Sequence, residues 1–163
     1  MKSLFHLPAH PLFVHGPVVL MPLVALFAVA LAIRKDWRER YVWQFVISCA
    51  VLLGATILAA RSGELFNTVV RDSVPTKRHR ELGETTRLIV AILFVASLAM
   101  AWATRRDRGA EAATAGNPGT ASVRPSVIAG WVVGALAVLG TIWMIRTGHE
   151  GARVVWTGTL KKQ

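Results

Sequence analysis

The chain has 163 residues, enough for one domain, and combines 53% hydrophobic residues with only 17% charged ones. Soluble domains carry about a quarter charged residues, so this composition favours a membrane protein. The formal net charge of +10 would suit a nucleic-acid partner, but the cations flank apolar segments instead of forming one basic surface. We therefore exclude nucleic acid as a partner and interpret these cations as anchors of membrane helices.

Four apolar segments are long enough to cross about 30 Å of hydrocarbon as helices. They cover residues 14–33, 42–60, 86–103 and 127–145. Such long runs without alternation argue against the strands of a membrane barrel. The sequence predicts an all-α integral membrane four-helix bundle, with one domain over residues 7–158 and short tails at 1–6 and 159–163. Residues 1–10 do not resemble a cleaved signal peptide, so we expect the first span to remain in the mature chain.

The three links between the spans differ in character. Residues 34–40 are short enough to force an antiparallel hairpin of helices. Residues 61–85 contain Pro75 and a basic group at 77–80, and we expect a short interfacial helix there. Residues 104–126 begin with arginines and continue through Ala, Gly, Thr and Ser, a composition typical of a flexible linker.

Four crossings place both termini on the side of the middle link. The first and third links carry cations directly at the span ends, with little acidic offset: Arg34, Lys35, Arg38, Arg40, Arg105, Arg106 and Arg108. Positive charge beside spans marks the cytoplasmic side. We therefore expect both termini on the extracytoplasmic side of a multi-pass membrane protein.

All five histidines fall on the side of the termini. His6, His10 and His15 precede or open the first span, His79 precedes the third, and His149 follows the fourth. Glu64, after the second span, is a further candidate on this side. The only cysteine, Cys49, lies inside a span, so neither an intrachain disulfide nor a CxxCH haem attachment motif exists.

Imidazoles at a membrane face can bind haem iron or a transition metal, move protons, or simply form hydrogen bonds. The candidate cofactor ligands are His10, His15, His79 and His149, and a metal site could add Glu64. Ordinary structural roles compete with this reading. Pro11 and Pro17 are typical of a helix start, the glycines beside His149 are typical of a helix end, and Glu64 fits a solvated carboxylate.

Two terminal motifs resemble a known family. The first span opens with HPLFVHGP at positions 10–17, and the fourth is followed by TGHEGARVVW at positions 147–156. Together they resemble the prokaryotic four-helix membrane family called domain of unknown function 2231, over residues 7–158. By match, His10, His15 and His149 occupy that family's histidine positions, and His79 matches a less fixed one. Gly16 and Glu150 depart from its usual pattern.

The resemblance also implies a location and a process. It implies the inner (plasma) membrane of a prokaryote. Some members of the family are fused to cytochrome c or Rieske-type domains, which implies membrane electron transfer. This chain carries no such domain, so redox partner proteins or a larger membrane complex would have to supply those centres.

Three functions remain open from the sequence. The first is a haem b protein for electron transfer, with His15 paired to His79 or His149 and arginines at the propionates. The second is a histidine site for copper, iron or zinc. The third is a non-catalytic structural or assembly subunit without cofactor, whose Gly130 and Gly134 form a GxxxG pattern for helix packing. No nucleophile elbow, HExxH or P-loop occurs, so we do not expect a stand-alone enzyme.

Overall fold

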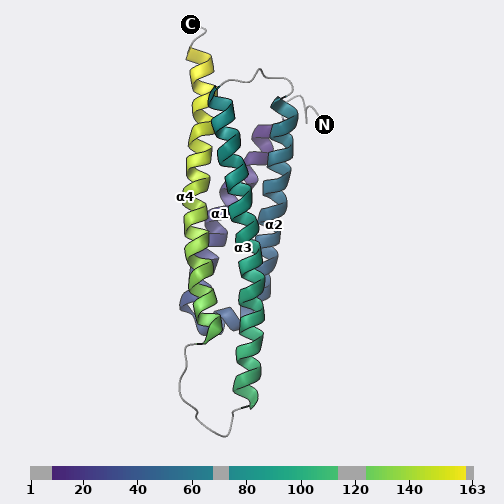
Figure 1. The fold of residues 1–163 in the computed structure, drawn as a ribbon, viewed down its shortest axis with the longest axis vertical. Helices are drawn as coiled ribbons and strands as arrows, with labels where there is room; N and C mark the ends of the chain where they lie inside the picture. Colours follow the sequence, from purple (N-terminus) through teal and green to yellow (C-terminus); the bar gives the residue numbers. More distant parts are fainter. Residues whose placement is uncertain (1–8, 68–73, 114–123, 161–163) are drawn as a thin grey trace.

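The computed structural model describes residues 9–67, 74–113 and 124–160 as four helices running alternately up and down (Figure 1). They are α1 (Ala9–Ile33), α2 (Lys35–Asn67), α3 (Val74–Ala113) and α4 (Pro125–Leu160). Each is long and apolar enough to cross a membrane. The predicted all-α membrane bundle of four helices is confirmed.

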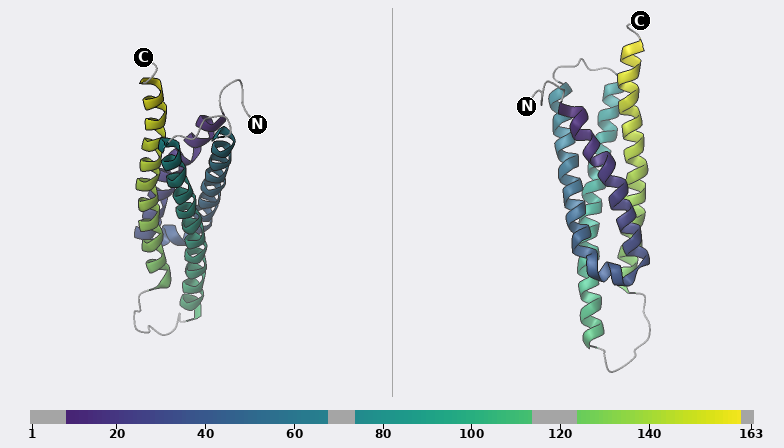
Figure 2. Two further views of the ribbon diagram at one scale, coloured as in Figure 1. Left: turned by 45° about the horizontal axis from the view of Figure 1, so that its top comes forward. Right: turned by 180° about the vertical axis from the view of Figure 1, so that it is seen from behind.

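Each helix packs against its neighbours in the chain, and α4 closes the ring against α1. Seen from behind, α1 runs obliquely between α2 and α4 (Figure 2). The bundle therefore has two ends. At the histidine end, α1 begins, α2 ends, α3 begins and α4 ends; at the hairpin end, α1 turns into α2 at Arg34 and α3 leads to α4 (Figure 1).

The core is formed by one stripe on each helix with residues spaced alternately four and three apart. This spacing is the heptad pattern of helices that pack nearly parallel and interdigitate along a seam. Buried positions that follow it are Pro17, Met21, Val24, Ala28 and Leu31 in α1; Arg38, Val42, Phe45, Cys49, Leu52 and Thr56 in α2; Thr86, Val90, Leu93, Ser97, Met100 and Thr104 in α3; and Ser126, Gly130, Val133, Ala137, Gly140, Met144 and Thr147 in α4.

The helices extend beyond the predicted spans. Only Arg34 separates α1 from α2, so residues 35–40, predicted as a link, are helical. The basic group at 77–80 belongs to α3 and not to a separate interfacial helix. Residues 104–113, predicted as part of a flexible linker, are the last turns of α3. Hydropathy detects only the segment inside hydrocarbon, whereas polar helix turns continue outside it.

The prolines of α1 occupy two kinds of position. The helix begins at Ala9, so Pro11 lies in its first turn, where a proline costs no helical hydrogen bond, whereas Pro17 and Pro22 lie inside the helix. A proline inside a membrane helix is tolerated where neighbouring groups satisfy the freed backbone carbonyl. The interpretation of Pro11 as a helix-start residue therefore agrees with its position, whereas the same interpretation of Pro17 is wrong.

Candidate functional site

His79 is the histidine that the described structure connects most clearly to a second helix. It lies near the start of α3, and its Nδ1 is 3.1 Å from the backbone oxygen of Thr147 in α4. A carbonyl oxygen only accepts hydrogen bonds, so Nδ1 carries the proton and donates it. In a neutral imidazole this leaves the lone pair on Nε2, the atom that can bind a metal or a haem iron.

Gly151 makes room for this imidazole. A Cβ at position 151 would lie 2.9 Å from Cε1 of His79 and 3.3 Å from its Nδ1. These distances are too short for an unstrained contact. Gly151 is one of the two glycines near His149 that the sequence alone suggested as part of a helix end. In the structure it lets the His79 ring approach the backbone of α4.

A buried hydrogen bond continues this contact toward the middle of the bundle. The hydroxyl oxygens of Thr86 in α3 and Thr147 in α4 are 3.0 Å apart, and both side chains are buried. On the outer side, Glu150 lies between two arginines, with Oε1 3.8 Å from Nε of Arg78 and 3.4 Å from a terminal guanidinium nitrogen of Arg153. Glu150 thus joins α4 to α3.

The other candidate ligands are not gathered around His79 in the described residues. His15 and His149 are exposed. His149 lies two residues from both Thr147 and Gly151, about 200° around the helix, so it faces away from His79. The side chains of His10 and Glu64 lie outside the described residues. Within the described part of the chain, no group of three His, Cys, Asp or Glu side chains could hold a metal ion.

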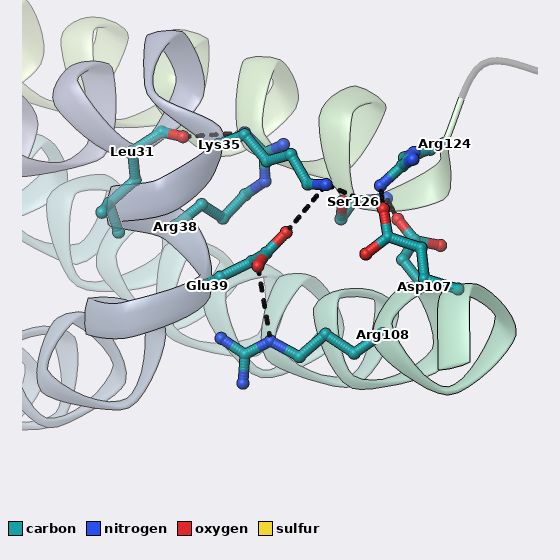
Figure 3. Close-up of polar contacts among 9 residues, drawn as sticks. Leu31, Lys35, Arg38, Glu39, Asp107, Arg108, Arg124 and Ser126 are labelled. Atoms are coloured by element: carbon teal, nitrogen blue, oxygen red, sulfur yellow. Dashed lines mark hydrogen bonds and ion pairs between the residues drawn. The ribbon is translucent and has the colours of Figure 1, made fainter. Parts of the chain in front are cut away.

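The hairpin end contains a buried arginine that the sequence did not single out. Arg38 is only 2% exposed. One of its terminal nitrogens donates a hydrogen bond of 2.9 Å to the carbonyl oxygen of Leu31 (Figure 3). The same nitrogen donates one of 3.3 Å to the carbonyl oxygen of Ala32. These carbonyls belong to the last turn of α1, where no helical partner is available and a cation is favoured.

Charged side chains around Arg38 connect the other helices. Nζ of Lys35 is 3.4 Å from the carboxylate of Glu39 (Figure 3). It is also 2.7 Å from the carboxylate of Glu111 in α3, which pairs with Arg124 as well. Asp107 of α3 accepts a hydrogen bond of 3.1 Å from the backbone nitrogen of Ser126, in the first turn of α4. A carboxylate at a helix N-terminus is stabilising. These contacts fix the entry into α4.

Small residues of α4 let it approach the end of α1. A Cβ at Gly130 would lie 3.4 Å from the Cα of Ala32 and 3.6 Å from the Arg38 guanidinium, and one at Gly134 would lie 3.7 Å from the Cβ of Ala32. The GxxxG pattern therefore packs within this chain. The contact encloses Arg38 between α1 and α4.

Comparison with known proteins gives one match. A family model described as "Predicted membrane protein (DUF2231)" matches residues 6–163. No curated protein matches the chain, and no solved structure does. Because the match covers nearly the whole chain, and the four membrane-spanning helices agree with its description, this protein belongs to the DUF2231 family of predicted membrane proteins.

Proposed function

We propose that this protein is an electron-transfer protein of the prokaryotic inner membrane that holds haem b at the histidine end of the bundle. The observation that carries the proposal is the hydrogen bond between Nδ1 of His79 and the backbone oxygen of Thr147. A carbonyl that accepts from one ring nitrogen fixes the tautomer and the orientation of a ligand histidine, and this arrangement is usual for histidines that bind metals. Haem iron bound there would supply one-electron chemistry.

The spacing of residues in the sequence favours His10 as the second histidine that would hold the haem iron. His79 continues the core stripe of α3, because it lies seven residues before the buried Thr86. The spacing of the α1 stripe, counted back from the buried Pro17 through Val14, arrives at position 10. A pair of histidines from two helices is the usual way for a helix bundle to hold a haem. His15 and His149, both exposed, are the alternative partners.

Cations near His79 suit the two propionates of a haem. The side chains of Arg78 and Arg153 are 64% and 60% exposed, and both also contact Glu150. Guanidinium groups pair well with carboxylates through parallel hydrogen bonds. The same residues would stabilise the charged edge of the group without bringing charge into the hydrocarbon.

A transition-metal site is the second candidate. It would use His10, His15, His79 and His149, with Glu64 as a further candidate ligand. Such a site needs three or four ligands that converge, whereas haem needs one or two. The free Nε2 of His79 supports both candidates, but the outward position of His149 favours haem. Redox partner proteins of the membrane or the periplasm would exchange electrons with it.

The charge distribution favours an orientation with the histidine end outside the cytoplasm. Arginines and tryptophans meet at the hairpin end, where Arg105 lies 4.7 Å from the ring centre of Trp43 and Arg106 lies 5.5 Å from that of Trp102. Arginine clusters beside spans mark the cytoplasmic side, and tryptophans mark the interface. Fusion of alkaline phosphatase to the C-terminus should give an active enzyme, and the same fusion after position 113 should not.

The decisive experiment is a visible spectrum of detergent-purified protein, oxidised and then reduced with dithionite, with metal analysis of the same sample. We expect a Soret band that shifts on reduction, and iron in proportion to protein. Stoichiometric metal without a Soret band would favour the second candidate. A sample with neither signal, even after incubation with hemin, would contradict both and leave a structural subunit of a membrane complex.

Variants identify the ligands. His79→Ala and His10→Ala should each lose the reduced spectrum, while His149→Ala should retain it because that side chain faces away from His79. All three should insert into the membrane equally, since insertion depends on the apolar spans. Loss of haem in His149→Ala alone would contradict the assignment of His79.

A further inference from the structure

A groove between α3 and α4 lies close to the hairpin end of the bundle. Its volume is about 320 Å³. The walls are apolar and include Ala96 and Ala99 of α3 and Pro125, Ile128, Ala129 and Val132 of α4. Ile128 and Val132 are 55% and 50% exposed, so the groove opens toward the surrounding bilayer. Pro125 begins α4, which places one end of the groove at the charged surface of the bundle.

The length of the groove fits a lipid chain better than a helix. From Pro125 to Val132 the helix rises roughly 10 Å, at about 1.5 Å per residue. One leaflet of a bilayer contributes about 15 Å of hydrocarbon. A groove of this length therefore fits much of one acyl chain that enters from the interface. A partner helix would cross the full membrane and would need a longer complementary face.

The basic side chain of Arg106 follows the groove residues of α3 toward the hairpin end. Arg106 follows Ala99 on the same face of α3, about two turns farther along. The Arg106 guanidinium lies over the ring of Trp102, 5.5 Å from its centre. Arg108 pairs with Glu39, whereas Arg106 forms no ion pair within the described part of the chain. Its charge is therefore available to an external anion.

We propose that this groove binds one anionic phospholipid of the surrounding bilayer. An acyl chain occupies the space between Ala99 and Val132, and the phosphate pairs with Arg106. Trp102 holds the guanidinium at the headgroup level, where tryptophan rings are favoured. The positive hairpin end, with Arg105 beside Arg106, attracts the anionic headgroup from the bulk lipid.

Native mass spectrometry of the detergent-solubilised full chain tests this assignment. Phosphatidylglycerol and phosphatidylcholine with the same acyl chains are titrated separately, and the fraction of protein that retains one lipid gives each dissociation constant. The wild type should bind phosphatidylglycerol more tightly. Arg106→Gln should weaken this binding about fivefold, the effect of one basic side chain near an anionic surface. Ala99→Leu, which fills the groove, should weaken it as well, and Arg106→Lys should retain it.

Arg34→Gln is the matched control, because Arg34 also lies over a tryptophan, 5.7 Å from the centre of Trp37, but does not line the groove. Its affinity should equal that of the wild type. If Arg34→Gln and Arg106→Gln lost the same affinity for phosphatidylglycerol, the lipid would be attracted by the overall positive charge of the hairpin end, and the proposal would be overturned. The proposal would also be overturned if the wild type bound phosphatidylglycerol no more tightly than phosphatidylcholine. A dimer that forms in competition with the lipid would assign the groove to a second copy of the chain and would also overturn it.

Discussion

Arg38 of α2 closes the C-terminus of α1 by donating a hydrogen bond of 2.9 Å to the backbone oxygen of Leu31. Replacing Arg38 with Met keeps much of the volume but leaves the carbonyls of Leu31 and Ala32 without this donor. A lost hydrogen bond to a charged group and an unsatisfied buried carbonyl together cost about 2 to 3 kcal/mol. We expect the free energy of unfolding in mixed micelles to fall by this amount. Arg40→Met, in which an exposed arginine over Tyr41 is lost, should change it by less than about 1 kcal/mol. Equal losses in the two variants would show that Arg38 contributes only as a surface cation.

Gly130 has no side chain, and this lets α4 lie close against the end of α1. Gly130→Leu would force its side chain against Ala32 and the Arg38 guanidinium, since a Cβ alone reaches 3.4 Å and 3.6 Å from them. Overpacking of this kind costs about 1 to 3 kcal/mol. Gly54 is the matched control, because a Cβ there meets nothing within 4 Å and the residue is exposed. Thermal unfolding should therefore occur at a lower temperature in Gly130→Leu than in Gly54→Leu. The reverse order would contradict the packing of α4 on α1.

The hydroxyl groups of Thr86 and Thr147 provide a third test. A double-mutant cycle with Thr86→Val and Thr147→Val should give a coupling free energy of about 0.6 kcal/mol, the average for hydrogen bonds between membrane helices. The reference pair is Thr56→Val with Thr147→Val, because Thr56 bonds only to the backbone of its own helix at Leu52, at 2.8 Å. That pair should show no coupling. A zero value for both pairs would mean that α3 and α4 do not share this bond in the folded protein.

Gly151 can be used to test the position of His79 without changing a histidine. Gly151→Val should displace the imidazole from Thr147 and reduce haem retention in the purified protein, because a Cβ at position 151 already crowds the ring. Gly148→Val has the same gain in side-chain bulk, but a Cβ there meets nothing within 4 Å. It should retain haem as the wild type does. If both variants retained haem, haem binding would not depend on the contact between His79 of α3 and Thr147 of α4.

The spans were predictable because a helix that crosses the bilayer needs a long apolar segment. Positions that face lipid and positions that face the core are both apolar, so hydropathy finds the span but does not show which side chains are buried. Leu26, 69% exposed, and Leu31, fully buried, look alike to any measure of hydropathy. The helix ends were less predictable, since residues 104–113 carry the charges of a link while continuing as helix. Outside the hydrocarbon, a polar segment gives no hydropathy signal that separates helix from loop.

The buried arginine was hidden among surface cations. Arg34, Arg38 and Arg40 all lie in the first link predicted from the sequence, and charge counting treats them equally. The spacing of Arg38 with Val42 and Phe45 does distinguish it, because positions four and seven residues ahead lie on one helix face. The contact of His79 with Thr147 had no comparable signal. It depends on how α3 and α4 align after residues 114–123, which no local pattern determines.

The single residue between α1 and α2 also bears on the order of assembly. Backbone hydrogen bonds of 3.0 Å run from Arg34 to Ala30 and from Arg38 to Arg34, so the chain reverses direction with almost no loop. Arg38 then bonds to a residue only seven positions earlier. Contacts so close in sequence form early, because little chain entropy is lost in making them. We expect α1 and α2 to enter the membrane as one joined unit during synthesis, and α4 to dock later onto a surface that is already formed.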